Sequence, residues 1–272
     1  MKNTTKHFPG FTLIELLVVV GILAALTALV LPKLDGLQGN ANHAVGAASA
    51  DDTGRFIQIY KSTKNRLPDG WDSLIDPVTN ELWAPANPST TPVTRGLHSE
   101  LSAAATGKLT KSNLTANQVA SLQAAGIYTL YDLGGPGVTS TTRPGDMFNV
   151  PVAIAEDTPV AFVSTTNGKK IIDHIYRDNL KAGGTSGKIG DGTKVLVAFG
   201  FGPHNAMIGK TMLEVPSYPN VDATLIYGRN LVIFEIPIGT STSTARAVFK
   251  AVVGADGDLI DDMAASLNKD AN

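Results

Sequence analysis

The sequence has no cysteine among its 272 residues. This absence excludes disulfide bonds, thiolate nucleophiles and thiolate metal ligands. Charge is also scarce: 22 basic and 24 acidic residues leave a net charge of −2, so the chain lacks the basic excess with which proteins bind nucleic acid. Apolar residues make up 43% of the chain, and a chain of this length can build a core without disulfides. We therefore expect no nucleic-acid partner, while cysteine usage leaves the cellular compartment open.

Motifs of common catalytic sites are missing as well. Residues 183–188 look like a phosphate-binding loop, but Ala182 stands at the required first glycine and Ile189 at the Mg²⁺-binding hydroxyl. A flexible turn is the better interpretation. The sequence contains no Gly-x-Ser-x-Gly turn and no His-Glu-x-x-His helix, and its five histidines form no recognisable ligand pair. We therefore expect a protein that is not an enzyme and holds no catalytic cofactor.

A long apolar segment near the N-terminus is the strongest feature that is present. From Phe11 to Leu31, Glu15 is the one ionisable side chain, and 14 of these 21 residues are Leu, Ile, Val or Phe. As a helix, such a segment is about 31 Å long, close to the hydrocarbon thickness of a bilayer. Its apolar side chains favour insertion by about 4 to 8 kcal/mol, more than the ~3 kcal/mol that one carboxylate costs. We predict that residues 11–31 cross a membrane.

The flanks of this segment predict its orientation. Lys2 and Lys6 precede it and no acidic residue does, which by the positive-inside rule places the N-terminus in the cytoplasm and the rest of the chain outside. Two alternatives are an ordinary secretory signal peptide and a plain signal anchor. A signal peptide would have a shorter apolar run before a small-residue cleavage site, and a plain anchor would leave Glu15 unexplained.

The residues around Gly10 give a more specific signal. The sequence GFTLIE, from Gly10 to Glu15, resembles the class III leader junction of type IV pilins and type II secretion pseudopilins. The resemblance implies that a prepilin peptidase cleaves between Gly10 and Phe11 and that the new Phe11 terminus is N-methylated. It also implies assembly roles for Glu15 and Pro32, which stand where the family has its glutamate and commonly a proline.

Glu15 invites a physical hypothesis about assembly. A lone carboxylate in an apolar helix is costly and usually has a partner. The α-amine of Phe11 in an adjacent subunit, exposed after cleavage, is a cation of suitable reach. Pairing the two groups in a filament would offset the cost of burial and set the axial register between neighbours.

An amphipathic helix should continue after the membrane segment. Pro32 removes one helical hydrogen bond and should kink the helix more than end it. Apolar residues then recur at three- and four-residue steps to about residue 64: Leu34, Leu37, Ala41, Val45, Ala48, Phe56 and Ile59. We expect this stripe to pack on the head or on neighbouring stalks. The predicted divisions are a leader at 1–10, a transmembrane and assembly helix at 11–31, a stalk helix at 32–65 and a globular head at 66–272.

The head should be an α+β domain. Strand-like runs occur at 127–133, 150–154, 160–164, 195–201, 224–227, 231–238 and 246–253. Short helices are expected at 171–181 and 258–268, and another begins after Thr115, with Gln118 completing its cap and Gly126 ending it. We predict a pilin-like fold in which an antiparallel sheet packs across the C-terminal half of the long N-terminal helix.

One acidic cluster is a candidate metal site. Four carboxylates lie within seven residues beside Gly257: Asp256, Asp258, Asp261 and Asp262. Oxygen-rich loops of this type can bind Ca²⁺, although the spacing does not fit an EF-hand. The family resemblance also implies calcium, since major pseudopilins bind it near their C-terminus. The alternative is a turn followed by an acid-rich helix N-terminus, which the helix dipole favours.

These features together predict a structural subunit of a type II secretion pseudopilus or of a type IV pilus-like filament. The resemblance implies three partners: prepilin peptidase, copies of itself with other pilins or pseudopilins, and an inner-membrane assembly platform. The subunit would wait in the inner membrane as a single-pass protein and then join a periplasmic or extracellular filament. The alternative is a pilin-anchored extracytoplasmic domain that binds a glycan or cargo, or acts as an enzyme.

Overall fold

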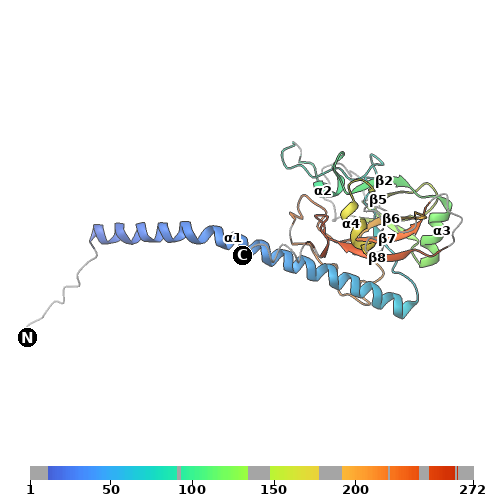
Figure 1. Cartoon of the computed structure of the whole chain (residues 1–272), viewed down its shortest axis with the longest axis horizontal. Helices are drawn as coiled ribbons and strands as arrows, with labels where there is room; N and C mark the ends of the chain where they lie inside the picture. The colour runs from blue at the N-terminus through green and yellow to red at the C-terminus, as the bar shows by residue number, and fades with distance from the viewer. Residues whose placement is uncertain are drawn as a thin grey trace, which may run out of the picture. The chain divides into compact units, whose positions relative to one another are not determined.

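The computed structural model describes residues 12–90, 93–133, 148–177, 192–219, 221–238, 245–260 and 262, without the side chains of residues 29–38, 133 and 148. The elements follow in the order α1 (Leu13–Lys64), β1 (Trp71–Asp72), α2 (Ser99–Ser102), β2 (Leu109–Asn113), α3 (Ala116–Ala125), β3 (Thr129–Leu133), β4 (Phe148–Ala153), β5 (Pro159–Val163), α4 (Lys169–Ile175), β6 (Lys194–Gly200), β7 (Leu231–Pro237) and β8 (Val248–Val253) (Figure 1). The chain divides into two compact units, Met1–Ala41 and Asn42–Asn272, so the last part of α1 belongs with the sheet.

Helix α1 is 52 residues long and ends at Lys64, as predicted. The next residue, Asn65, has a positive φ of 54°, the left-handed conformation that commonly stops a helix. Part of the predicted membrane span at 11–31 is not described: Phe11 lies outside the described residues, and the side chains of residues 29–31 are not described. The side chain of Pro32 is not described either. Within the described part of the chain, no helix has both the length and the apolar character that crossing a membrane would require.

Strand β6 is the centre of one eight-stranded sheet. It pairs antiparallel with β7 along its whole length, from Lys194 opposite Pro237 to Gly200 opposite Leu231. Along its other edge it pairs first with β5 and then, at Gly200, with β1. Strand β8 extends the sheet beyond β7, β2 extends it beyond β5, and β3 and β4 follow β1. The pair β1–β3 is parallel and the others are antiparallel, so the expected antiparallel sheet is largely confirmed.

Both faces of the sheet are covered. Alternate side chains of β6 enter different cores: Val197 and Phe199 enter one, and Leu196 and Ala198 enter the other. The first core is completed by α1 and α3, and the second by α2, α4 and the segment between β1 and α2 (Figure 1). All seven residues of β7 are buried as a result, which explains why all of them except Glu235 are apolar and do not alternate with polar residues.

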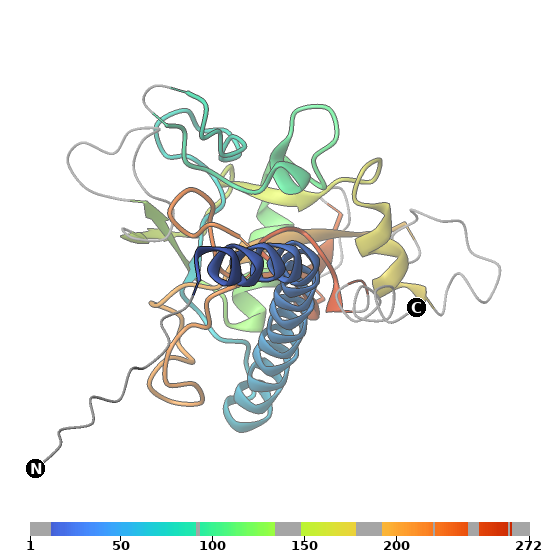
Figure 2. The same cartoon turned by 90° about the vertical axis from the view of Figure 1, so that its left-hand side faces the viewer.

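The head packs on another face of α1 than most of the described part of the predicted stripe, so packing on neighbouring stalks stays a prediction for that stripe. The buried residues of α1 are Gly46, Ala50, Thr53, Ile57 and Tyr60. Of the predicted stripe, Phe56 packs against this core, but Val45 and Ile59 are 56% and 48% exposed and Ala48 is exposed. Both faces of the helix have three- and four-residue spacing, and the sequence does not reveal which of them meets the sheet. Figure 2 shows the part of α1 that joins the head, at the blue-green end of the helix.

Most other predicted elements are confirmed. Six predicted strands correspond to β3 to β8, and α3 has the expected ends: the Thr115 amide donates to Gln118 Oε1 at 3.0 Å, and Gly126 has a φ of 105°. The strand predicted at 224–227 is wrong, because the amides of Leu225 and Ile226 both donate to the Asp222 carbonyl and form a turn. Strands β1 and β2 were not predicted. The predicted helix at 258–268 lies mostly outside the described residues.

Candidate functional site

The start of α1 is closed by Thr12 and Glu15. The amide and hydroxyl of Thr12 both donate to Glu15 Oε2, at 2.8 and 3.0 Å. In return, the Glu15 amide donates to Thr12 Oγ1 at 3.3 Å. This reciprocal arrangement is a capping box, which satisfies backbone donors that the first turn of a helix leaves free. Glu15 therefore caps α1, a role that the sequence alone did not lead us to predict, although its signal, a threonine three residues before a glutamate, was present.

The other predicted residues of this end of the chain are not described. Gly10 and Phe11, between which cleavage is predicted, lie outside the described residues, and Pro32 lies where side chains are not described. The predicted processing and the pairing of Glu15 with a neighbour's amine therefore stay predictions.

The first turns of α1 expose an apolar surface on all sides. Ten large apolar side chains are exposed between residues 13 and 26, with Leu13 84% exposed and Leu17 68% exposed. The others are Ile14, Leu16, Val18, Val19, Val20, Ile22, Leu23 and Leu26. A helix that is apolar all round is stable when other helices or lipid surround it, because its transfer out of water is favourable.

A second exposed surface lies on α1 opposite the buried face. It consists of Val45, Ala48, Asp52, Arg55 and Ile59, which we call the outer stripe. All five side chains are exposed, and the steps between them are three, four, three and four residues. This heptad spacing is typical of a helix that packs along another helix. The charged pair in the middle gives the outer stripe one acid and one base, three residues apart.

The acidic residues described near the C-terminus, Asp256 and Asp258, have partners within the chain. Asp256 Oδ2 accepts a hydrogen bond from the Tyr218 hydroxyl at 2.8 Å, and Oδ1 accepts from the Asp258 amide at 3.0 Å. The ammonium of Lys108 lies 3.6 Å from Asp258 Oδ1. In the ranges that the structure describes, no three His, Cys, Asp or Glu side chains are placed to hold a metal ion. Asp261 lies outside those ranges, so calcium binding by the four-aspartate set stays a prediction.

A buried acid that the sequence analysis missed lies in β1. The side chain of Asp72 is fully buried, and its Oδ2 accepts hydrogen bonds from the Tyr227 hydroxyl at 2.8 Å and from Arg229 Nη1 at 3.0 Å. Burial raises the pKa of Asp72 to about 7, although Arg229 and Tyr227 oppose the shift. A Cβ at residue 202 would lie 1.8 Å from Asp72 Oδ1, so Gly202 is required there. Because solvent does not reach it, we interpret Asp72 as a structural link between β1 and the segment that carries Tyr227 and Arg229.

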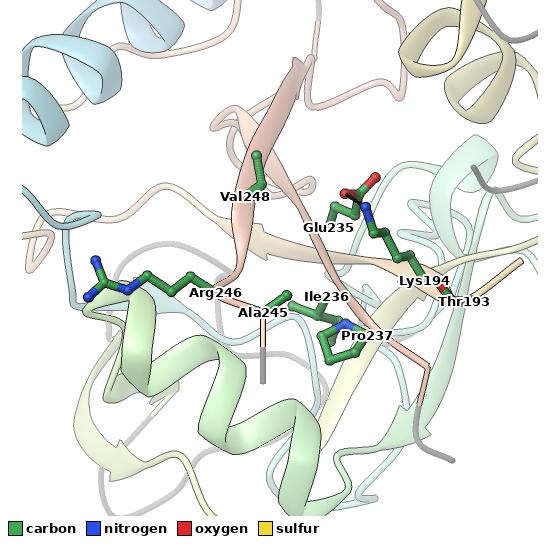
Figure 3. Close-up of a pocket in the computed structure, with 8 residues that line it drawn as sticks. All are labelled: Thr193, Lys194, Glu235, Ile236, Pro237, Ala245, Arg246 and Val248. Carbon is green, nitrogen blue, oxygen red and sulfur yellow. Dashed lines mark ion pairs between the residues drawn. The ribbon is translucent and has the colours of Figure 1, made fainter. Parts of the chain in front are cut away.

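A small cavity in the head is lined by an ion pair between Lys194 and Glu235. It has a volume of about 60 Å³ and is lined by Thr193, Lys194, Glu235, Ile236, Pro237, Ala245, Arg246 and Val248. Figure 3 shows Lys194 beside Glu235 and Arg246 extended away from them. Glu235 pairs with Lys194 and with Lys250, each at 3.1 Å, and accepts a hydrogen bond from Tyr176. Burial raises the pKa of Glu235, but hydrogen bonds from Tyr176, Lys194 and Lys250 lower it below its ordinary value.

Comparison with known proteins agrees with the N-terminal features. Residues 6–31 match the prokaryotic N-terminal methylation motif. The chain is also similar to the type IV wide pilus major component PilA4 of Thermus thermophilus, with 38% identity over 70 residues, which are 26% of this chain. The aligned region spans about half, 53%, of that relative's length. No solved structure matches the chain. The chain therefore carries the methylation motif over residues 6–31 and is similar over 70 residues to a type IV pilin.

Proposed function

We propose that the chain is a structural subunit of a type IV pilus-like filament and joins that filament through α1. The observation that carries the proposal is the apolar surface of α1 between residues 13 and 26, exposed on all sides. Such a surface needs a surrounding of lipid or of other helices. A precursor in the inner membrane and a helix bundle in a filament supply these two surroundings in turn. The similarity to a wide-pilus component favours a type IV pilus-like filament over a type II secretion pseudopilus.

The proposed maturation begins at the leader. A prepilin peptidase cleaves between Gly10 and Phe11, and the new Phe11 amine is N-methylated. The capping box holds the Glu15 carboxylate at the end of α1 through Thr12. That position allows a neighbour's Phe11 amine to approach the carboxylate from beyond the helix end, so the cap and the intersubunit pair are compatible.

The outer stripe supports packing between copies of the chain. Val45 and Ile59 are large apolar side chains that the head leaves exposed, and their heptad spacing suits a neighbouring helix. Asp52 of one copy and Arg55 of another have opposite charges on this surface. We propose that parallel copies pack along the outer stripe with these two residues in register. An inner-membrane assembly platform would supply the energy for adding each copy to the filament.

The buried acids of the head favour a scaffold role over a catalytic one. In the cavity of Figure 3, Glu235 is bound by two lysines and a tyrosine of its own chain, which leaves it a poor general acid or base. The buried Asp72 is likewise held by Tyr227 and Arg229.

Intact-mass analysis of the membrane-extracted protein tests the proposal. We expect a mature chain that starts at Phe11 and carries one methyl group. In the matched Gly10→Val variant we expect the leader to stay uncleaved, so that the chain starts at or near Met1, because a branched residue replaces the glycine at the cleavage site. A mature native chain that starts at Met1, or one that stays monomeric in cells with a working assembly platform, would refute the proposal.

A further inference from the structure

The acidic turn at residues 254–258, which follows β8, is built around a lysine from a distant part of the chain. The turn is closed by two backbone hydrogen bonds, from the Gly254 amide to the Asp258 carbonyl at 2.8 Å and from the Gly257 amide to the Gly254 carbonyl at 2.9 Å. The ammonium of Lys108 donates to the Gly257 carbonyl at 2.9 Å. The side chain of Lys108 is 13% exposed, so water competes little for these contacts.

The same ammonium has two carboxylate partners. It lies 2.5 Å from Glu100 Oε2 and 3.6 Å from Asp258 Oδ1. Its three oxygen partners come from α2, from the turn backbone and from the turn side chain. The ammonium donates hydrogen bonds to Glu100 and to the Gly257 carbonyl, and its contact with Asp258 is an ion pair.

The backbone of the turn is shaped to admit the lysine stem. Gly257 has a positive φ of 89°, and a Cβ there would lie 3.2 Å from both Cδ and Nζ of Lys108. Glycine adopts this conformation without strain and leaves room for the stem. On the other side of the turn lies Asp256, whose carboxylate accepts a hydrogen bond from the Tyr218 hydroxyl.

We infer that the ammonium of Lys108 is the cation of the acidic turn and that it closes the head without a divalent metal ion. A divalent ion that used Glu100, Asp258 and the Gly257 carbonyl would have to displace Lys108 from all three. The ammonium therefore joins α2, the start of β2 and the acidic turn into one unit, whatever the calcium concentration outside the cell.

Thermal melting of the full chain in detergent micelles tests this inference. The native chain should melt at the same temperature, within about 1 °C, in EDTA and in millimolar CaCl₂. Lys108→Met keeps the length of the stem and removes the charge. It should lower the melting temperature by roughly 3–10 °C in both buffers, because the largely buried ammonium that joins Glu100, Asp258 and the Gly257 carbonyl is lost. The matched control is Lys111→Met. Lys111 pairs with Glu81 at 3.0 Å, but Glu81 is 65% exposed, so we expect a loss below about 3 °C.

A second variant keeps the inference testable if Lys108→Met does not fold. Glu100→Gln leaves the ammonium in place and removes one of its charged partners, so it should cost less than Lys108→Met. In the double variant the two losses should not add, since both substitutions break the same contact. The inference is overturned if calcium raises the melting temperature of the native chain, if Lys108→Met melts like the native chain, or if the two losses add.

Discussion

The ring of Tyr218 lies against Gly46 of α1 so closely that a Cβ at residue 46 would be 2.9 Å from its Cε2 atom. Tyr218 cannot move away freely, because its hydroxyl donates to the buried carboxylate of Asp256. One glycine therefore decides how closely the end of the head approaches the helix. The other small residues of the buried face, Ala50 and Thr53, continue this close approach.

Gly46→Leu should destabilise the head by about 1–3 kcal/mol, because the new side chain overpacks the contact with Tyr218. The expected readout is a lower midpoint in thermal melting, followed by near-ultraviolet circular dichroism. Gly39→Leu is the matched control, since nothing lies within 4 Å of a Cβ at that position. It should raise helix stability slightly, because leucine is a better helix former than glycine. Equal effects of the two substitutions would contradict the prediction.

The stability of the head should depend on the protonation of Asp72. Its pKa is about 7 in the folded chain and 3.8 as the ordinary value, so the folded state binds the proton more tightly than the unfolded state. The contribution of Asp72 to the free energy of unfolding therefore falls as pH rises from about 4 to about 7, by at most roughly 4 kcal/mol, and is constant above that range.

Asp72→Asn should remove this dependence. The difference in the free energy of unfolding between the variant and the native chain should rise in favour of the variant from pH 5 to pH 8. Denaturant titration at the two pH values measures this difference. Other groups titrate in both proteins and cancel in the difference. Two stability curves that stay parallel across this range would show that Asp72 is charged throughout.

Two substitutions separate the roles of Glu15. Glu15→Gln keeps an acceptor oxygen for the Thr12 amide and removes the charge, so α1 should remain capped while filament assembly falls. Thr12→Val removes the hydroxyl from the capping box, which should cost the helix about 1 kcal/mol and leave assembly largely intact. Pelleted filaments measure assembly, and circular dichroism measures helix content. If Thr12→Val abolishes filaments and Glu15→Gln does not, the cap matters more than the charge.

Charge reversal tests the outer stripe. Asp52→Arg and Arg55→Asp should each reduce filament yield, since each places like charges opposite one another between copies, and the double variant should restore it. One exposed pair contributes only about 0.2–1 kcal/mol, but a filament repeats the contact at every subunit. Arg55 also lies 3.8 Å from Asp51 in its own chain, and Asp51→Asn serves as the control for that weaker pair. Equal yields from all four chains would exclude the outer stripe as an interface.

Periodicity in the sequence predicted the central elements well. β6 and β7 were recognisable because most of their residues are apolar, as expected for strands covered on both faces. The ends of α3 were recognisable because Thr115, Gln118 and Gly126 have local physical roles. Strand β2 was missed because Lys111, Ser112 and Asn113 make it polar, and it lies at the edge of the sheet.

Contacts between distant residues could not be predicted in this way. The position of Lys108 beside Asp258 depends on how β2, α2 and β8 meet, and no local pattern encodes it. Whether the predicted stripe of α1 packs on the head or on neighbouring stalks stayed open, because two stripes with similar spacing run along one helix. Choosing between them requires the partner surface, including Tyr218 and Asn230, which donates to Ser49 and Thr53 at 3.0 and 3.2 Å.

Because cores cover both faces of the central strands β6 and β7, recognition of a ligand would use exposed parts of the head outside them. The hairpin at residues 76–81 is one such part: the Asp76 amide donates to the Glu81 carbonyl at 2.8 Å, and Val78 at its tip is 65% exposed. Sequence changes there leave both cores untouched. An epitope tag inserted after Val78 should therefore display on assembled fibres while the fold beneath it stays as it is.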